Sequence, residues 1–506
     1  MVIDVGLVKL LAVLFLTLLL AKAIAVIARW WLHRRYLRTR VGVPCKPHWV
    51  LGHLVEDDRL ARDILIRYAR KLPRLQLQLL GPFLSAVTVS HPDTIAETMR
   101  TNPSQNELIG KLARVWIGNG LIFSQGERWA RDHRLLSKVF TLEMRREYVG
   151  AFKDATDIML DEWNDQVGRS VDMANYLPML AFDIILRTAM GAETTCQTDT
   201  DPNTPARRYE AAVKDISEII FNRYKQPWFY SDFIFLNSPT GSRFKKLLAE
   251  THAFSGGLIT ERRRVLREAA DSRAPLGVPR RRDMLDVLLT VRDEDGVGYS
   301  DSDIREHVET FLHAGHDTTS AALEWAILYL SRNPGVQERC RQEVLAVLEE
   351  HGGLKHFAHN HLAELPYLTQ TIQETLRIAS VAPFVVKTCQ KDCQVEGVQF
   401  PAGTDFQINI IGVHHNEQVW TDPDTFKPDR FSPDQGTRSS YAFIPFSCGP
   451  RTCIGKHFAM DEMKVVLSMI LSRFRLLPDP DAAETKSKMG IFVKPDPPVH
   501  VLLEFV

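Results

Sequence analysis

The chain has 506 residues, and its apolar and charged fractions of 45% and 25% are ordinary for a globular protein. Its 62 basic and 62 acidic side chains cancel, so the bulk charge gives no reason to expect a nucleic-acid partner. The seven cysteines are odd in number and scattered, which argues against a disulfide framework and for a reducing compartment.

An apolar run from Leu10 to Ala28, interrupted only by Lys22, has the length of a membrane span. Two tryptophans and a basic cluster follow it, so the positive-inside rule places everything after the run in the cytosol. A cleaved signal peptide is the alternative, but the run lacks a small-residue cleavage site and its positive charge lies on the wrong side. We therefore predict an anchor over residues 5–28, a basic and proline-containing linker over 29–48, and one further domain over 49–506.

The first half of that domain predicts a hairpin followed by helices. Apolar and polar residues alternate over residues 74–90 around Gly81-Pro82, as in two strands joined by a turn. A helical pattern covers residues 123–140, and helical patterns dominate from there to about residue 268. Two polar segments interrupt them and are expected to be surface loops, at residues 197–208 and 269–282.

The strongest helix signal covers residues 300–332. Ser300 and Asp303 form a capping-box-like pair at its start, and Asn333-Pro334 ends it. At about 1.5 Å per residue this helix spans roughly 48 Å, enough to cross a whole domain. A second helix is predicted over 368–378, whereas strand patterns cover 384–411 and the tail after residue 486. The sequence therefore predicts a mainly α fold with a small, discontinuous β part.

The segment A-G-H-D-T-T, at Ala314–Thr319, lies in the middle of the long helix. Gly, Asp and Thr weaken helices, so the segment predicts a bulge with a free carbonyl and room for a small ligand. Asp317 and Thr318 can then supply a carboxylate and a hydroxyl to a proton relay. A polar patch on a surface helix is the alternative. A metal site with His313 and His316 is not expected, because the spacing is not H-E-x-x-H.

A charge pattern precedes the cysteine-containing loop. Glu374 and Arg377 stand at i and i+3 on one helix face, a pair that is common on protein surfaces. Arg430, in K-P-D-R-F, offers a third charge that can close a triad with Glu374. Each signal is weak alone and gains force from its place before the loop.

The stretch F-S-C-G-P-R-T-C-I-G, at Phe446–Gly455, runs into an apolar-periodic helix. Cys453 stands at the mouth of this helix, where unpaired N–H groups and the helix dipole favour an anion. We therefore expect a bias towards the thiolate, the form that binds a metal or attacks an electrophile. Gly455 leaves no side chain above the turn, so a flat ligand can lie close to it. A buried structural cysteine is the alternative.

In combination these segments resemble the cytochromes P-450, the haem-thiolate monooxygenases. The matching features keep the family's order and spacing over nearly the whole chain: an N-terminal anchor, W-x-x-x-(R/H), A-G-x-D-T-T, E-x-x-R, P-x-R-F and F-x-x-G-x-R-x-C-x-G. Finer matches resemble the family-4 branch of fatty-acid and eicosanoid hydroxylases, at residues 48–54, 412–416, 442–447 and 458–467. The resemblance implies the cytochrome P-450 fold with a single N-terminal transmembrane helix.

The resemblance also implies a role for each matching residue. Cys453 is the expected proximal ligand of haem b iron, as is general in that family. Asp317 and Thr318 match the pair that delivers protons during oxygen activation. Glu374, Arg377 and Arg430 match a structural triad. The other haem-binding residues it implies, some of them through the propionates, are Arg451, Trp129, His133 or Arg134, Phe446, Gly455 and Lys387.

Three positions depart from the family pattern. Many family-4 members have, at the position of Ala314, an acid that forms an ester to a haem methyl, so we expect non-covalent haem here. Lys387 replaces the usual arginine, a point charge in place of a fork. Ala379-Ser380 replaces the usual His-Pro, and residues 381–386, expected to line the distal pocket, follow it.

The resemblance implies a membrane-bound enzyme that inserts one oxygen atom into a C–H bond of a lipophilic substrate. Hydroxylation of a fatty acid or eicosanoid at or near its ω end is expected by family analogy. In-chain hydroxylation or epoxidation of fatty acids, sterols or xenobiotics is the alternative. The implied electron source is NADPH through a flavoprotein reductase, with cytochrome b5 as a further donor. The implied location is the endoplasmic reticulum membrane, with the catalytic domain cytosolic.

Two classes of protein compete with this interpretation. A haem-thiolate isomerase or peroxide-dependent enzyme needs no reductase, but such enzymes tend to lose the acid–Thr pair found at Asp317 and Thr318. A non-catalytic haem sensor or lipid carrier needs neither residue.

Overall fold

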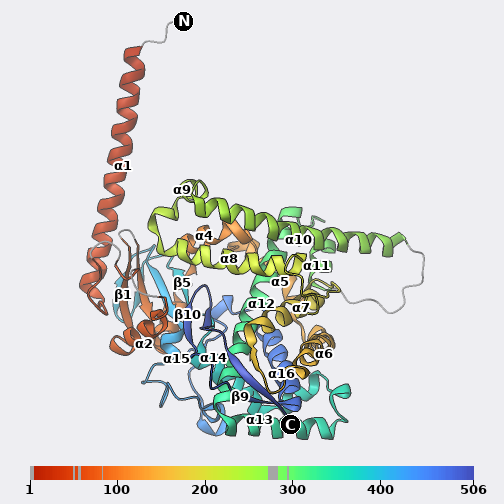
Figure 1. Cartoon of the computed structure of the whole chain (residues 1–506). Helices are drawn as coiled ribbons and strands as arrows, with labels where there is room; N and C mark the ends of the chain where they lie inside the picture. The colour runs from red at the N-terminus through yellow and green to blue at the C-terminus, as the bar shows by residue number, and fades with distance from the viewer. Residues whose placement is uncertain (1–4, 49–51, 55–57, 82–83, 272–282, 293–295) are drawn as a thin grey trace.

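Helices form most of the structure, a computed structural model that describes residues 5–48, 52–54, 58–81, 84–271, 283–292 and 296–506 (Figure 1). The α-helices within these ranges are α1 (Val5–Arg40), α2 (Ala61–Lys71), α3 (Pro92–Arg100), α4 (Glu107–Ile117), α5 (Gly126–Leu136), α6 (Leu142–Asn164), α7 (Leu177–Ala189), α8 (Pro205–Lys225), α9 (Asp232–Leu236), α10 (Pro239–Asp271), α11 (Met284–Thr290), α12 (Asp301–Arg332), α13 (Pro334–Glu350), α14 (Pro366–Ala379), α15 (Ile410–His414) and α16 (Lys456–Arg473).

The strands are short and divide among four small sheets. One sheet has the order β1-β2-β8-β5-β3, in which β2 and β8 are parallel; the others are β4-β12-β9, β10-β11 and β6-β7. Their bounds are β1 (Leu75–Leu80), β2 (Leu84–Val89), β3 (Ser104–Gln105), β4 (Ser170–Asp172), β5 (Phe384–Thr388), β6 (Cys393–Val395), β7 (Val398–Phe400), β8 (Asp405–Asn409), β9 (Phe474–Pro478), β10 (Lys486–Met489), β11 (Val493–Asp496) and β12 (His500–Phe505). The predicted fold class, mainly α with a discontinuous β part, is confirmed.

Helix α1 stands apart from the rest of the molecule (Figure 1). Its segment Val13–Arg40 is long and apolar enough to cross a membrane, and its most apolar window is not buried against the protein. The helix continues through the basic cluster to Arg40, so only residues 41–48 of the predicted linker are non-helical. Near its end, Leu37 and Val41 are buried in the apolar core around the five-stranded sheet. This last turn therefore joins α1 to the body of the protein.

Helix α12 runs through the centre of the body, with α7, α14 and α16 around it (Figure 1). Its start is fixed as predicted: the Asp303 amide donates to Ser300 Oγ at 3.2 Å, and the Ser300 amide donates to Asp303 Oδ2 at 3.3 Å. Gly315 lets α7 approach closely, because a Cβ there would lie 2.7 Å from Ile185 Cδ1. The helix thus presents residues 314–319 inside the molecule.

The predicted charge triad forms and is fully buried. Arg377 donates to both oxygens of Glu374, at 2.7 and 2.8 Å, and Arg430 Nε donates to Glu374 Oε1 at 2.9 Å. Arg377 also donates to the carbonyls of His414 and Pro423, at 2.7 and 2.8 Å. The triad therefore ties α14 to the loop that follows α15, upstream of the cysteine loop.

The local expectations for the middle of the chain are only partly right: α8 begins at Pro205, inside the predicted loop 197–208, and α10 continues to Asp271, inside the predicted loop 269–282. β1 and β2 pair antiparallel from Leu75↔Val89 to Leu80↔Leu84, as the hairpin pattern predicts. Three predicted features extend outside the described ranges: the hairpin turn at 82–83, most of the 269–282 loop, and part of the 48–54 match.

Candidate active site

The cysteine loop turns sharply before α16. Gly449 has a φ of 74°, and a Cβ there would lie 2.6 Å from Met99 Cε, so the position requires glycine. The Cys453 amide then donates to the Phe446 carbonyl at 2.9 Å, which folds the loop back on itself. Cys453 comes to lie just before the first turn of α16, as predicted.

The expected bias of Cys453 towards the thiolate is wrong for the free thiol. Burial raises the pKa of Cys453, although the Gly455 amide and the Lys456 ammonium lower it. The sulfur is deeply surrounded by protein, yet Cys453 is exposed to solvent. Nearby protein therefore raises its pKa, while part of its surface remains open to solvent. Cys453 can therefore take a ligand.

Arg451 in this loop and Lys387 on β5 are two cations to which no carboxylate among the described residues bonds. Lys387 on β5 is only 2% exposed and donates to Gln105 Oε1 at 2.7 Å. Half-buried Arg451 donates to the carbonyls of Leu121 and Ser124, at 3.3 and 2.5 Å. Burial and then the Arg451 charge lower the pKa of Lys387 to about 8, and burial lowers the pKa of Arg451 to about 10. Such a pair suits an anionic ligand, which would relieve both effects.

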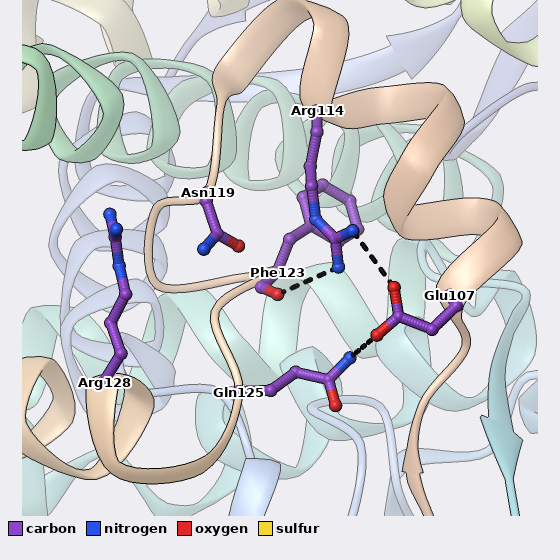
Figure 2. A pocket seen from close by; sticks show the side chains of 6 residues that line it. All are labelled: Glu107, Arg114, Asn119, Phe123, Gln125 and Arg128. Atoms are coloured by element: carbon purple, nitrogen blue, oxygen red, sulfur yellow. Dashed lines mark hydrogen bonds and ion pairs between the residues drawn. The ribbon is translucent and has the colours of Figure 1, made fainter.

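The segment 118–125, whose carbonyls accept hydrogen bonds from Arg451, is also braced by side chains of α4 (Figure 2). Arg114 donates to Glu107 Oε2 at 3.1 Å and to the Phe123 carbonyl at 3.4 Å, and Gln125 donates to the other Glu107 oxygen. These groups border a hollow of about 500 Å³ together with Asn119 and Arg128. Both arginines have carboxylate partners, so we assign this hollow to the support of the loop and not to the reaction.

Helix α5 adds an aromatic face to the two cations. The Trp129 and His133 rings are 5.0 Å apart between centroids, and the Arg451 guanidinium lies 4.2 Å from the Trp129 centroid. Arg134 is exposed and has no described contact with this group. The structure therefore brings Trp129, His133, Arg451 and Lys387 to one place and leaves Arg134 outside it.

The expected bulge at Ala314–Thr319 is wrong, because α12 is an uninterrupted α-helix. Thr318 Oγ1 donates to the Ala314 carbonyl at 2.8 Å, and Thr319 Oγ1 donates to the Gly315 carbonyl at 3.0 Å. Each hydroxyl donates to the carbonyl one turn back in the helix, so α12 accommodates the two threonines without a break. The polar atoms predicted for this site are present, but on regular helical backbone.

Asp317 has a partner that the sequence did not indicate. Its carboxylate is buried and accepts a hydrogen bond from the Lys494 ammonium on β11. Burial alone raises the pKa of Asp317, but chiefly the Lys494 ammonium holds it below its ordinary value. Burial lowers the pKa of His313 to about 4, so this ring is neutral at physiological pH.

Phe140 connects the middle of α12 to the cysteine loop. Its ring stacks on Phe311 of α12, with 5.8 Å between centroids, and meets the Phe458 ring of α16 edge-on at 6.1 Å. A Cβ built on Gly455 would lie 3.9 Å from both Phe140 Cε1 and Cys453 Sγ. The loop and the long helix therefore border a shared region of the core.

Comparison with known proteins decides the family. A family model described as Cytochrome P450 matches residues 43–503 of the chain. The chain belongs to the cytochrome P-450 family. It is therefore a haem-dependent monooxygenase, and members of this family generally take electrons from a redox-partner reductase and act on lipophilic substrates.

Several characterised P-450 enzymes are similar to the chain over most of its length. "Cytochrome P450 4F12" of Homo sapiens is 36% identical over 425 residues, 82% of this chain and 79% of that protein. "Cytochrome P450 4F1" of Rattus norvegicus is 34% identical over 464 residues, 88% of this chain and 86% of that protein. "Leukotriene-B4 omega-hydroxylase 3" of Mus musculus is 34% identical over 448 residues, 86% of this chain and 84% of that protein.

A solved structure confirms the P-450 fold. The protein titled "Crystal structure of cytochrome P450DA heme domain" aligns with a TM-score of 0.79 and 24% sequence identity. The alignment covers 92% of this chain and 98% of that chain.

The residues present fit a haem. Gly455 has a φ of −87°, and a Cβ there would make only ordinary contacts, so neither backbone nor protein neighbours require a glycine. A bare position beside an accessible cysteine leaves room for a flat group. The cations Lys387 and Arg451, paired only with an amide and carbonyls among the described residues, match the two carboxylates of such a group.

Sequence reasoning missed three residues that the structure places at this P-450 site. Gln105 accepts from Lys387, Arg114 braces the Arg451 segment, and Lys494 pairs with Asp317. Local sequence carries no signal for the Lys387 and Lys494 contacts, because each joins elements that are distant along the chain, and the Arg114 contact depends on how the segment after α4 folds back. The mixed, β-type pattern of the tail after residue 486 indicated strands in the region of Lys494 but not its partner.

Proposed function

We propose that this P-450 hydroxylates fatty acids or eicosanoids at or near the ω end of the chain. The similarity to a protein named as a leukotriene-B4 ω-hydroxylase, 34% identity over 86% of this chain, carries the proposal. The substrate class in that name is also the class that the sequence resemblance implied.

In this proposal Cys453 holds the haem iron through its sulfur. Lys387 and Arg451, with Trp129 and His133 on α5, would hold the propionates, while Phe446 and Gly455 shape the loop that carries Cys453. Arg134, which is exposed, is the weaker of the two candidates on α5. When bound, the haem supplies dioxygen activation for insertion of one oxygen atom into a C–H bond.

Asp317 and Thr318 are the proposed proton donors of the reaction. The Thr318 hydroxyl points its proton at the Ala314 carbonyl, from which it can turn by rotation about one side-chain bond. The Asp317 carboxylate lies on the same turn of α12 and is ionised beside Lys494. The pair places an exchangeable proton site and a charged acceptor together on one rigid helix.

The haem is proposed to be non-covalent, because Ala314 has no carboxyl group that could form an ester. Acid–acetone extraction should release all of it from the purified enzyme. An Ala314→Glu variant that retains haem after extraction would provide the matched positive control. Haem retained by the unaltered chain would contradict this part of the proposal.

The protein is further proposed to be a single-pass protein of the endoplasmic reticulum membrane with its catalytic domain in the cytosol. The isolated apolar helix α1 followed by a basic cluster supports this placement. In that location a flavoprotein reductase using NADPH is the proposed electron donor, with cytochrome b5 as a further donor.

A product screen in reductase-supplemented membranes tests the substrate class. Fatty acids, eicosanoids and sterols are incubated with NADPH, and the oxygenated products are identified by mass spectrometry. We expect ω or near-ω alcohols of the fatty acids or eicosanoids. Products from sterols alone would reject the proposed substrate class.

In-chain hydroxylation or epoxidation is the second candidate, and Ala314 favours it. A small residue at this point of α12 leaves the haem untethered and takes little space beside it. The same screen separates the two, because in-chain alcohols or epoxides would then outnumber ω products.

The proton-donor assignment has a separate test. Thr318→Ala should lower the fraction of NADPH consumption that yields product, whereas Thr319→Ala should not. The control is closely matched, since Thr319 makes the same type of bond to a carbonyl one turn back, at 3.0 Å. Equal coupling in Thr318→Ala and the unaltered enzyme would remove Thr318 from the mechanism.

A further inference from the structure

Lys494 on β11 reaches Asp317 on α12, although the two residues are 177 positions apart in the chain. Its ammonium contacts Asp317 Oδ1, and the side chain of Lys494 is 41% exposed whereas that of Asp317 is 11% exposed. One end of this ion pair therefore lies in the core beside Thr318, and the other lies at the surface. This pairing is not part of the roles proposed above.

The position of Lys494 is fixed on both sides of β11. The amide of the preceding residue, Val493, donates to the Val381 carbonyl at 2.8 Å. The Val493 carbonyl accepts from Trp325 Nε1, on α12 itself, at 3.1 Å. Because Trp325 and Asp317 lie on the same helix, these bonds hold the base of the Lys494 side chain at a set distance from the carboxylate.

The Asp317 carboxylate depends on this partner. Among the described residues no other side chain or amide donates to its oxygens. The groups that face it are Lys494 from β11 and, from α12, His313 and His316; Glu324 also lies near Lys494 on the same helix. His313 is neutral and its Nδ1 has no described partner, so it does not replace the lysine. A buried carboxylate with one counter-ion loses its charge or its orientation when that counter-ion is removed.

We propose that Lys494 is the positioning residue of Asp317: it keeps the carboxylate ionised and turned towards the surface, where Asp317 takes up protons from bulk water. Lys494 stays an ammonium throughout. Each proton comes from solvent, converts the carboxylate to the acid, and leaves again towards Thr318, which restores the ion pair. The proposal rests on the proton-donor role of Asp317 and adds the residue that positions its carboxylate.

Infrared difference spectroscopy of the holoenzyme labelled with ¹³C-aspartate tests the first half of the proposal without turnover. The band that disappears in Asp317→Asn identifies Asp317, and its protonation is followed as a function of pH. We expect the protonation midpoint to move to higher pH in Lys494→Met and to return in Lys494→Arg. An unchanged midpoint in Lys494→Met overturns the proposal.

Coupling of NADPH consumption to product tests the second half in the same proteins. Lys494→Met should be uncoupled to the extent of Asp317→Asn, Lys494→Arg should recover, and the double variant should be no worse than Asp317→Asn alone. The matched control is Lys488→Met, since Lys488 is an exposed lysine opposite Lys494 in the β10–β11 register. It should change neither readout.

The outcomes separate this inference from the proposed function. If Asp317→Asn couples normally, the proton-donor role itself is wrong, even when the infrared midpoint shifts as expected. If Asp317→Asn uncouples but Lys494→Met does not, Asp317 acts without Lys494, and only the present inference fails.

Discussion

Lys387 shows what burial does to a single charge at this site. Its pKa is lowered to about 8 by burial and by Arg451, against an ordinary value of about 10.4. A group that binds its proton less tightly in the folded state than in the unfolded state destabilises the fold wherever both forms are charged. The two cations therefore destabilise the fold of the haem-free protein, and together they form a binding site for an anion.

Lys387→Gln should consequently have opposite effects on the two forms of the protein. The haem-free form should become no less stable, because one of two neighbouring cations is removed, whereas haem should leave the holoenzyme faster. The measurements are thermal unfolding of the haem-free protein and transfer of haem to an excess of an acceptor globin. Lys387→Arg is the control and should retain haem; faster loss from Lys387→Arg as well would point to packing and not charge.

The pH dependence of the haem-free protein follows from the same shift. Between about 8 and about 10.4 the unfolded chain keeps a proton on Lys387 that the folded chain has lost, so unfolding takes up a proton. The contribution of Lys387 to the free energy of unfolding should therefore rise with pH through this window. Comparing thermal unfolding of Lys387→Gln and the unaltered protein from pH 7 to pH 10.5 isolates it; parallel curves would contradict the shifted pKa.

At the level of single residues, the sequence predicted the groups of the site better than their partners. The loop around Cys453 and the pair Asp317–Thr318 lie in contiguous motifs, so their types and spacing were visible. Lys494 belongs to none of these motifs. Its pairing with Asp317 depends on how β11 packs against α12, which local sequence does not specify. The direction of the Cys453 pKa was wrong for a related reason, since burial is a property of the whole fold.

Among the elements, α14 and its triad make the clearest stability prediction. Glu374→Ala should destabilise the protein by roughly 3–5 kcal/mol, because it leaves Arg377 and Arg430 buried without their counter-charge. Chemical unfolding measures this loss. Asp424→Ala is the control: its ion pair with Arg70 spans 2.6 Å but the carboxylate side chain is 63% exposed, and such pairs contribute about 0–1 kcal/mol. Equal losses in the two variants would mean that the triad is not a special constraint.

Element types were more predictable than their interruptions. The capping residues and Pro334 marked α12 to within one residue, because these signals act through local backbone bonds. The bulge was not found, since helix propensity counts Gly, Asp and Thr as unfavourable but does not include what the threonine hydroxyls bond to. Local penalties of a few tenths of a kcal/mol per residue are readily outweighed by packing of α12 on α7 and α14.

On the scale of the whole molecule, the apolar residues divide between a helical core and a smaller core around the five-stranded sheet. The sequence indicated the proportion of helix and strand but not this division, because it depends on contacts between distant segments. The end of α1 is an example. Leu37 and Val41 lie in a segment that its sequence marks as a linker, yet they are 1% and 4% exposed.

The truncation of α1 should therefore have two distinct outcomes that depend on where it is made. Removal of residues 1–28 deletes most of the apolar span but leaves Leu37 and Val41 in place, so the body should unfold at an unchanged temperature and no longer sediment with membranes. Removal of residues 1–42 also deletes these two side chains, the Tyr36 hydroxyl bond to the Gln399 carbonyl at 2.9 Å, and the Gly42 carbonyl that accepts from the Leu77 amide at 2.8 Å. Full burial of each side chain contributes about 1.5–3 kcal/mol, so this longer truncation should lower the unfolding temperature by several degrees.

Thermal unfolding of both truncated forms in detergent makes the comparison, and Leu37→Ala in the shorter truncation tests whether the Leu37 side chain accounts for the difference. Equal stability of the two truncations would show that α1 is joined to the body by the chain alone.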